Sequence, residues 1–339
     1  MDPERGKTVT ADLEARFDRH NVVYKTVDET AIEAAIFIPK PLTSSSSEAT
    51  SAPVLVHFHG GCLITGAVPE PFFLADWVRD LAYTTNAIFV SAGYRLAPET
   101  PAVGILDDVA DFWAWLYDDE GLAAAVRALF PHVRAAPDLD RVAAVGESAG
   151  GYLALQSALH LHPTATATTN SPRRLRAVIA QYPSLFTDLA AFDARPAQRD
   201  PALEALVAEW AAAARASGRA RVSAPWPGDA EAMLAALAEG LVRELLLGPD
   251  PAGRLTLRHA LDRAGDPPPP VWIVQGDADD LVPRPATDEL VERLRAARPA
   301  AEVKYTVMPG GGHGFDALST LEDDWVREGV AFIKRHWLE

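Results

Sequence analysis

The sequence GESAGG at residues 146–151 constrains this chain more than any other stretch. An apolar run of strand length, residues 142–145, precedes it, and the helix-forming run YLAL at residues 152–155 follows it. A sharp turn from strand to helix around G-x-S-x-G strains the central residue, and only hydrogen-sized neighbours avoid clashes there. The helix that follows directs its positive N-terminal end toward the turn, where negative charge is stabilised. The pattern therefore predicts that Ser148 is a nucleophile at a strand–turn–helix junction.

Apolar runs of strand length alternate with helical patterns along most of the chain. The runs lie at residues 54–58, 87–90, 142–145, 177–180, 271–274 and 303–307. Such alternation predicts a parallel sheet with helices on both faces. Two earlier runs, at residues 22–27 and 32–38, are separated by a polar turn and predict an antiparallel hairpin at a sheet edge. One of the helical patterns has apolar side chains at core spacing: Ile105, Val109, Phe112 and Leu116.

The alternation breaks between residues 184 and 266. Ala-rich, helix-prone segments at residues 201–216 and 229–247 replace the strands there. This insertion directly follows a strand, at the edge of the sheet where α/β active sites lie. We therefore predict one domain over residues 1–339, with residues 184–266 forming a helical cap over Ser148. The Ser-rich residues 43–48 are too polar and repetitive to pack and predict a linker.

A serine hydroxyl needs a base within hydrogen-bond reach, and the base needs an orienting acid. His313 lies in PGGGHGF at residues 309–315, directly after the last predicted strand, so we predict it as the base. The acid should follow the run at residues 271–275, where Asp277, Asp279 and Asp280 are candidates. Asp279 is preferred because its spacing places it past the strand end, whereas the other two are expected to make turn or cap hydrogen bonds.

Acyl transfer also requires donors for the oxyanion, and the sequence HGGC at residues 59–62 directly follows the predicted strand at residues 54–58. We expect backbone N–H groups from Gly60, Gly61 and, as a further candidate, Cys62 to form an oxyanion hole with that of Ala149. His59 is expected to hold this loop rather than to move protons. His57, two residues earlier, is expected to be structural as well.

Bulk properties exclude several classes of function. The formal net charge of −16 disfavours nucleic acids and anionic membranes as partners. The N-terminus has no apolar signal-like run, and no later run approaches the roughly 20 residues that span a bilayer, so we expect a soluble cytoplasmic protein. Cys62 is the only cysteine, which excludes an intrachain disulfide and a multi-cysteine metal site. We expect no cofactor and no metal. The expected partner is a small-molecule ester substrate. The sequence leaves open whether the chain forms a homodimer.

Four motifs together resemble the hormone-sensitive-lipase-like branch of the α/β-hydrolases, the carboxylesterase type. They are HGG at residues 59–61, YRLAPE at 94–99, GESAGG at 146–151 and HGF at 313–315. The resemblance covers the chain from about residue 54 to the C-terminus. It implies an α/β-hydrolase fold whose mostly parallel central sheet has helices on both faces. It also implies that residues 1–50 contribute to the cap and the sheet edge, and that Arg95 and Glu99 support the active site.

The chain departs from this family in three places. Cys62 stands where the family commonly has a third glycine, so its side chain either enters the acyl pocket or packs behind the loop. The acid loop reads Asp279-Asp280-Leu281 where Asp-Pro-Leu is usual, which keeps the choice of acid open. The proline and aromatic residues usual after YRLAPE are replaced by TPAVG at residues 100–104.

The expected function is a serine hydrolase that cleaves small to medium carboxylic esters through an acyl-enzyme on Ser148. The same triad could instead serve lactone or amide hydrolysis, or acyl transfer and product release in a biosynthetic pathway. A non-catalytic small-molecule receptor is a hypothesis from another class. That route normally loses a triad residue, and here Ser148, His313 and an acid are all present.

Overall fold

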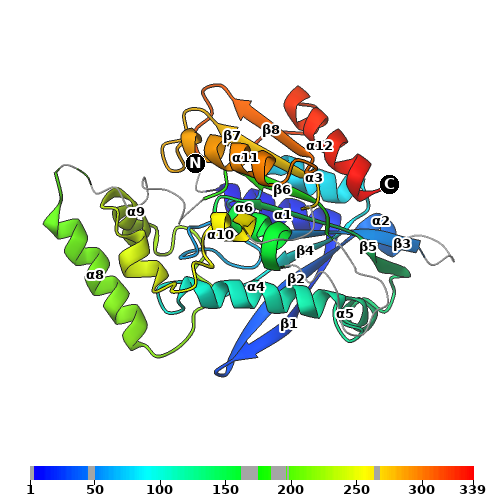
Figure 1. The fold of residues 1–339 in the computed structure, drawn as a ribbon. Helices are drawn as coiled ribbons and strands as arrows, with labels where there is room; N and C mark the ends of the chain where they lie inside the picture. Colours follow the sequence, from blue (N-terminus) through cyan, green and yellow to red (C-terminus); the bar gives the residue numbers. More distant parts are fainter. Residues whose placement is uncertain (1–3, 45–49, 162–174, 185–195, 197, 263–267) are drawn as a thin grey trace.

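A computed structural model describes residues 4–44, 50–161, 175–184, 196, 198–262 and 268–339 (Figure 1). Its centre is a sheet of eight strands in the order β1-β2-β4-β3-β5-β6-β7-β8. The strands are β1 (Phe17–Val27), β2 (Thr30–Pro39), β3 (Thr50–Phe58), β4 (Ile88–Ala92), β5 (Ala135–Glu147), β6 (Leu175–Gln181), β7 (Val271–Gly276) and β8 (Val303–Met308). Each predicted apolar run lies in or overlaps one of these strands, so the predicted strand pattern is confirmed.

The sheet is parallel except at one edge. β1 pairs with β2 and β2 with β4 in antiparallel register, whereas all pairs from β4 to β8 are parallel. The hairpin predicted from residues 22–38 is therefore present, with β1 as the edge strand. Because parallel strands end at one side, the loops after β3, β5, β6, β7 and β8 gather at the same edge of the sheet.

Helices cover both faces of the sheet, as predicted. One face carries α1 (Arg5–Arg16), α3 (Asp76–Thr84) and α12 (Asp324–Trp337), and these pack in one hydrophobic cluster. The opposite face carries α4 (Ala102–Tyr117), α5 (Leu122–Leu129), α6 (Ala149–Gln156) and α11 (Arg284–Ala297), which pack in a second cluster. Two short helices complete the described core: α2 (Lys40–Ser44) and the π-helix η1 (Ser157–Leu161).

Alternate residues of each strand face the two clusters. In β3, Val54, Val56 and Phe58 pack against the α4 side, and Leu55 packs against the α3 side. All four are fully buried, which explains why this strand is continuously apolar in the sequence. The four apolar residues that predicted a core helix are buried in α4 as well.

The described part of the insertion is mainly helical, with non-helical connections between its helices. It contains α8 (Pro201–Ala216), α9 (Ala230–Ala238), the π-helix η2 (Val242–Leu247) and α10 (Leu257–Asp262). Figure 1 shows α8 and α9 together at one side of the molecule. The predicted helical segment at residues 229–247 is two helices, because Gly240 adopts a positive φ of 62° between them. Residues 185–195, 197 and 263–266 of the insertion, and residues 45–48 of the predicted linker, lie outside the described residues. The cap stays a prediction.

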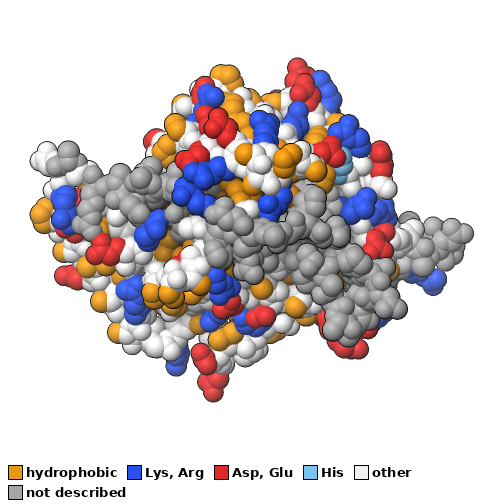
Figure 2. Space-filling view, in the orientation of Figure 1, with side chains coloured by type: hydrophobic (Ala, Val, Ile, Leu, Met, Phe, Trp, Pro, Cys, Tyr) orange, Lys and Arg blue, Asp and Glu red, His pale blue; other side chains and the backbone are white. Residues whose placement is uncertain are grey.

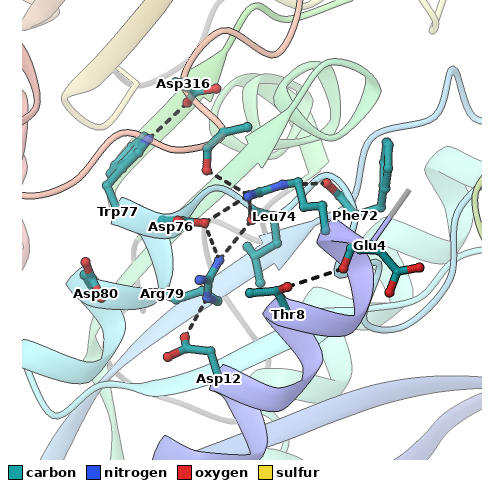
Figure 3. Close-up of polar contacts among 12 residues, drawn as sticks. Glu4, Thr8, Asp12, Phe72, Leu74, Asp76, Trp77, Arg79, Asp80 and Asp316 are labelled. Atoms are coloured by element: carbon teal, nitrogen blue, oxygen red, sulfur yellow. Dashed lines mark hydrogen bonds and ion pairs between the residues drawn. The ribbon is translucent and has the colours of Figure 1, made fainter. Parts of the chain in front are cut away.

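The N-terminal helix α1 is tied to the loop before α3. The Arg5 guanidinium donates to the carbonyl oxygens of Phe72 (3.1 Å) and Leu74 (2.8 Å), and it pairs with Asp76 (3.1 Å). Figure 3 shows how Asp76 also meets Arg79 of α3. The segment predicted to join the cap therefore packs on α3, and its part in a cap stays a prediction.

The surface mixes residue types. Figure 2 shows acidic and basic side chains interspersed with apolar ones over one face of the molecule. Within the described residues, none of the helices combines the length and the apolarity needed to cross a bilayer.

Candidate active site

Ser148 lies at the predicted junction between β5 and α6, with φ 53° and ψ −117°. The glycines around it are required by close backbone contacts. A Cβ on Gly150 would lie 1.9 Å from the carbonyl oxygen of Phe58, and one on Gly146 would lie 2.3 Å from the backbone of Gly150. The strained conformation of Ser148 is therefore held by backbone packing from two strands and one helix.

The Ser148 hydroxyl has a partner that the sequence analysis missed. Its Oγ lies 2.9 Å from the Oγ of Ser184, and the Ser184 backbone N–H donates to the Ser148 carbonyl oxygen (3.0 Å). Ser184 is buried and follows β6. The sequence offered one signal for this role: Ser184 comes just after the predicted strand at residues 177–180, and that strand lies beside the strand that leads to Ser148. Ser148 and His313 are both described, and the structure has no hydrogen bond between their side chains. The hydrogen bond between a catalytic nucleophile and its base is often long before substrate binds.

His313 and Asp279 meet across the ends of β7 and β8. The Nδ1 atom of His313 lies 2.9 Å from Oδ2 of Asp279, whose side chain is fully buried. Because Asp279 is a carboxylate acceptor, Nδ1 carries the hydrogen, and Nε2 is left to accept a proton. The His313 ring packs edge-on against Tyr182, with ring centroids 4.8 Å apart. Tyr182 lies two residues before Ser184, so His313 is close to the loop that contacts Ser148.

The environment of Asp279 distinguishes it from the other two candidate acids. Its Oδ1 accepts from the backbone N–H groups of Leu281 (3.0 Å) and Val282 (2.8 Å), and its Oδ2 also accepts from the Gln275 side chain (3.1 Å). Asp277 instead accepts from the backbone N–H of Gly310 (2.6 Å), in the loop that leads to His313. Asp280 is exposed. Of the three candidates, Asp279 alone contacts His313.

The loop after His313 is anchored through Asp316, which the sequence analysis did not single out. Its buried carboxylate accepts from Trp77 of α3 (3.0 Å), from Gln181 (2.5 Å) and from the Tyr182 hydroxyl (2.9 Å); Figure 3 shows the contact with Trp77. Burial raises the pKa of Asp316. These three donors fix the loop between α3 and the end of β6, and His313 is held with it.

The predicted oxyanion loop needs one correction, at Gly60. The backbone N–H of Gly60 donates to Oε1 of the buried Glu147 (2.8 Å). It is therefore already engaged and is not available to an oxyanion. The other oxygen, Oε2, lies 2.9 Å from Nε2 of His57, which also meets Ser91 through Nδ1 (3.2 Å). His57 is thus structural, as predicted, and Glu147 holds the loop beside the nucleophile.

The remaining predicted donors have free backbone N–H groups. Within the part of the chain that the structure describes, no acceptor contacts the N–H groups of Gly61, Cys62 or Ala149. A Cβ on Gly61, whose φ is 102°, would lie 2.1 Å from the Thr65 carbonyl oxygen, so glycine is required there. Cys62 also has a positive φ, of 57°, and its side chain packs in the buried cluster on the α4 side. Burial raises the pKa of this thiol to about 12, which keeps it protonated.

His59 holds the loop from behind. Its Nδ1 lies 2.8 Å from the Gly60 carbonyl oxygen, and its ring stacks on Tyr94 with centroids 4.3 Å apart. The Tyr94 hydroxyl donates to the His59 carbonyl oxygen (2.7 Å). Burial lowers the pKa of His59 to about 4, so the ring is neutral near pH 7. A buried neutral imidazole that acts as a donor to backbone fits the structural role predicted for it.

The supporting residues implied by the resemblance also make buried contacts. Arg95 pairs with the fully buried Asp108 (Nε to Oδ2, 2.7 Å). Glu99 pairs with Arg221 of the insertion (3.0 Å). Within the described ranges, no three His, Cys, Asp or Glu side chains gather in a way that could hold a metal ion.

Comparisons with known proteins agree with this architecture. A family model described as "alpha/beta hydrolase fold" matches residues 55–317. "Probable carboxylesterase M8" of a Phoma species is 29% identical over 338 residues, which cover 95% of this chain and 97% of that protein. "Non-reducing polyketide synthase ausA" of Aspergillus calidoustus is 27% identical over 329 residues, 86% of this chain and 13% of that protein.

Solved structures show the same fold. The esterase LipW from Mycobacterium marinum is 20% identical, with a TM-score of 0.56 over 98% of this chain and 84% of that one. A hyperthermophilic esterase from the archaeon Pyrobaculum calidifontis is 18% identical, with a TM-score of 0.57 over 98% and 91%. The fold predicted from the sequence is confirmed: the chain belongs to the α/β-hydrolase family, in the hormone-sensitive-lipase-like branch that its motifs resemble.

Proposed function

We propose that this protein is a carboxylic ester hydrolase that uses Ser148, His313 and Asp279 as a catalytic triad. The observation that carries the proposal is the 2.9 Å contact between His313 and the buried Asp279, close to a serine held at a strained strand-to-helix turn. A buried carboxylate fixes the imidazole tautomer that accepts the serine proton. The similarity to carboxylesterases over nearly the whole chain supports the same activity.

In the acylation step, the Ser148 oxygen attacks the ester carbonyl carbon while its proton moves to Nε2 of His313. The carbonyl oxygen gains negative charge, and we expect the N–H groups of Gly61, Cys62 and Ala149, which no described acceptor contacts, to stabilise it. His313 then returns the proton to the leaving alcohol as the C–O bond breaks. Gly60 takes no part as a donor, because its N–H stays on Glu147.

In the deacylation step, a water molecule attacks the acyl-Ser148 ester and gives its proton to His313. Collapse of the second tetrahedral intermediate releases the carboxylic acid and returns the proton to Ser148. Asp279 stays ionised throughout and stabilises the imidazolium that forms in each step. The reaction needs no cofactor, and a small ester and water are its only substrates.

The test is the loss of activity when the nucleophile is removed. Ser148→Ala should lower kcat for p-nitrophenyl butyrate by about 10⁶-fold, as for other triad serines. A fluorophosphonate should label the wild-type protein at Ser148, located by peptide mass spectrometry, and should not label the variant. Ser217→Ala, an exposed serine at the end of α8, is the matched control. Activity within tenfold of wild type in Ser148→Ala would disprove the proposal.

A second candidate keeps the triad but passes the acyl group to an acceptor other than water. It is favoured by the match between 86% of this chain and a segment of a polyketide synthase. Incubation with an acyl N-acetylcysteamine thioester, with and without an added alcohol, separates the two outcomes. Ester product at the expense of free acid would support acyl transfer, and free acid alone would support hydrolysis.

We further propose a cytoplasmic location. The support is the single, buried cysteine, since chains in reducing compartments do not depend on disulfides. Cell fractionation with an antibody against the protein tests this location.

A further inference from the structure

A short segment of the insertion, residues 221–226, lies against the loop that follows the oxyanion residues. Gly66 and Ala224 exchange two backbone hydrogen bonds, of 2.7 and 2.8 Å. The Thr65 hydroxyl donates to the same Ala224 carbonyl oxygen (2.6 Å). The Leu96 N–H donates to the Arg221 carbonyl oxygen (2.7 Å). Backbone hydrogen bonds therefore join the insertion to two core segments: two bonds at Gly66 and one at Leu96.

The Arg221 side chain joins the same two core segments a second time. Its Nη2 donates to the carbonyl oxygens of Ile64 (3.2 Å) and Ala97 (3.1 Å). Its Nε lies 3.0 Å from a Glu99 carboxylate oxygen, and its Nη1 pairs with Asp229 at the start of α9. One guanidinium thus contacts the oxyanion loop, the YRLAPE segment and a helix of the insertion.

These contacts bear on the turn that presents the oxyanion donors. The Ile64 and Thr65 N–H groups both donate to the Gly61 carbonyl oxygen (2.9 Å each), which closes a tight turn over residues 61–65. Within it, Gly61 and Cys62 have positive φ. A non-glycine residue in this conformation persists only where its surroundings hold it. Contacts that hold Ile64, Thr65 and Gly66 therefore hold the peptide planes of Gly61 and Cys62.

We propose that Arg221 is a positioning residue for the oxyanion hole, through which the insertion controls the geometry of the Gly61 and Cys62 N–H groups. The inference rests on the proposed function, because it takes these two N–H groups as oxyanion donors. Preorganised donors stabilise a transition state only where they point at the developing charge. Arg221 is not proposed as a catalytic residue; it acts on the donors through the carbonyl oxygen of Ile64.

The fork geometry of arginine is required for this role. Two hydrogens on one nitrogen serve two carbonyl oxygens from different segments, while the other nitrogens meet carboxylates. A lysine ammonium keeps the charge but is a point donor on a flexible stem. Arg221→Lys should therefore preserve the ion pairing that stabilises the fold and lose the alignment of the loop.

The experiment compares Arg221→Met and Arg221→Lys with wild type. For each we would measure kcat and KM with p-nitrophenyl butyrate per titrated active site, and the inhibition constant of an alkyl trifluoromethyl ketone. Such a ketone adds to the serine, and its oxyanion occupies the hole. Loss of a whole donor costs roughly 10²- to 10³-fold, so misalignment should lower kcat about 10- to 100-fold. KM should stay within about threefold, and the ketone should bind more weakly by a factor similar to the loss in kcat.

The matched control is Arg219→Met, since Arg219 lies two residues earlier in the insertion and is exposed. It should leave all three quantities within about twofold. The inference is overturned if both Arg221 variants keep wild-type kcat and ketone affinity per active site, whatever the yield of folded protein. A change in KM alone overturns it as well. Failure of the proposed function would be recognised separately. In that case Ser148→Ala, with Arg221 unchanged, would retain activity.

Discussion

Replacement of Asp279 by asparagine tests the acid assignment because the structure determines how the amide must orient. The Asp279 carboxylate accepts four hydrogen bonds. Two backbone N–H groups donate to Oδ1, and the side chains of Gln275 and His313 donate to Oδ2. An asparagine at this position has one acceptor oxygen. Two fixed backbone donors, at 3.0 and 2.8 Å, hold that oxygen on the Oδ1 side, so the NH₂ group faces Gln275 and His313.

Gln275 cannot relieve this conflict by turning its amide. Its NH₂ group also donates to the carbonyl oxygens of Gly276 and Val282, and its oxygen accepts from Thr287 (2.8 Å). The introduced asparagine amide would therefore donate to Nδ1 of His313 and select the tautomer with its hydrogen on Nε2. That tautomer cannot accept the Ser148 proton, and no negative charge remains to stabilise the imidazolium.

The expected loss in kcat for Asp279→Asn is about 10⁴-fold, which corresponds to about 5.4 kcal/mol of transition-state stabilisation. The assay is p-nitrophenyl butyrate hydrolysis at pH 7.5, with circular dichroism to verify the fold. Asp280→Asn, at an exposed position, should stay within twofold, and Asp277→Asn keeps an oxygen for the Gly310 N–H and should lose less than tenfold. Activity of Asp279→Asn within tenfold of wild type, or a crippled Asp277→Asn, would refute the assignment.

Two further predictions follow from buried groups around the site. Ser184→Ala removes the side-chain hydrogen bond to the Ser148 hydroxyl and should lower kcat/KM about 3- to 10-fold, since such a bond is worth about 1 kcal/mol. Ser184→Thr should recover most of the lost kcat/KM. An unchanged kcat/KM in Ser184→Ala would show that the contact does not contribute to catalysis. His59 has a pKa lowered by burial from 6.5 to about 4, so its contribution to stability is fully present above about pH 6.5 and is lost progressively as the pH falls from there to about 4. Urea unfolding should show about 2.5 kcal/mol of this loss between pH 7.5 and 4.5, and an equal pH dependence in His59→Phe would contradict it.

The fold and the Ser148 turn could be predicted because they depend on neighbouring residues. Continuous apolar runs reveal strands buried on both faces, and the glycines of GESAGG are needed by a turn of six residues. The order of motifs then indicated which loops meet at one edge of the sheet. The break between α9 and η2 was missed, since a single glycine in an Ala-rich run does not by itself end a helix.

The sequence by itself determined the strand pattern, the strained serine and the loops that carry His313 and Asp279, because each follows from local propensity and motif spacing. Only the tertiary structure decided how donors and acceptors are shared. The Gly60 N–H is taken by Glu147, 87 residues away, and the Arg221 side chain reaches Ile64 across 157 residues. A backbone N–H looks the same in the sequence whether it is free or engaged. Which acceptor reaches it depends on segments that only the folded sheet brings together.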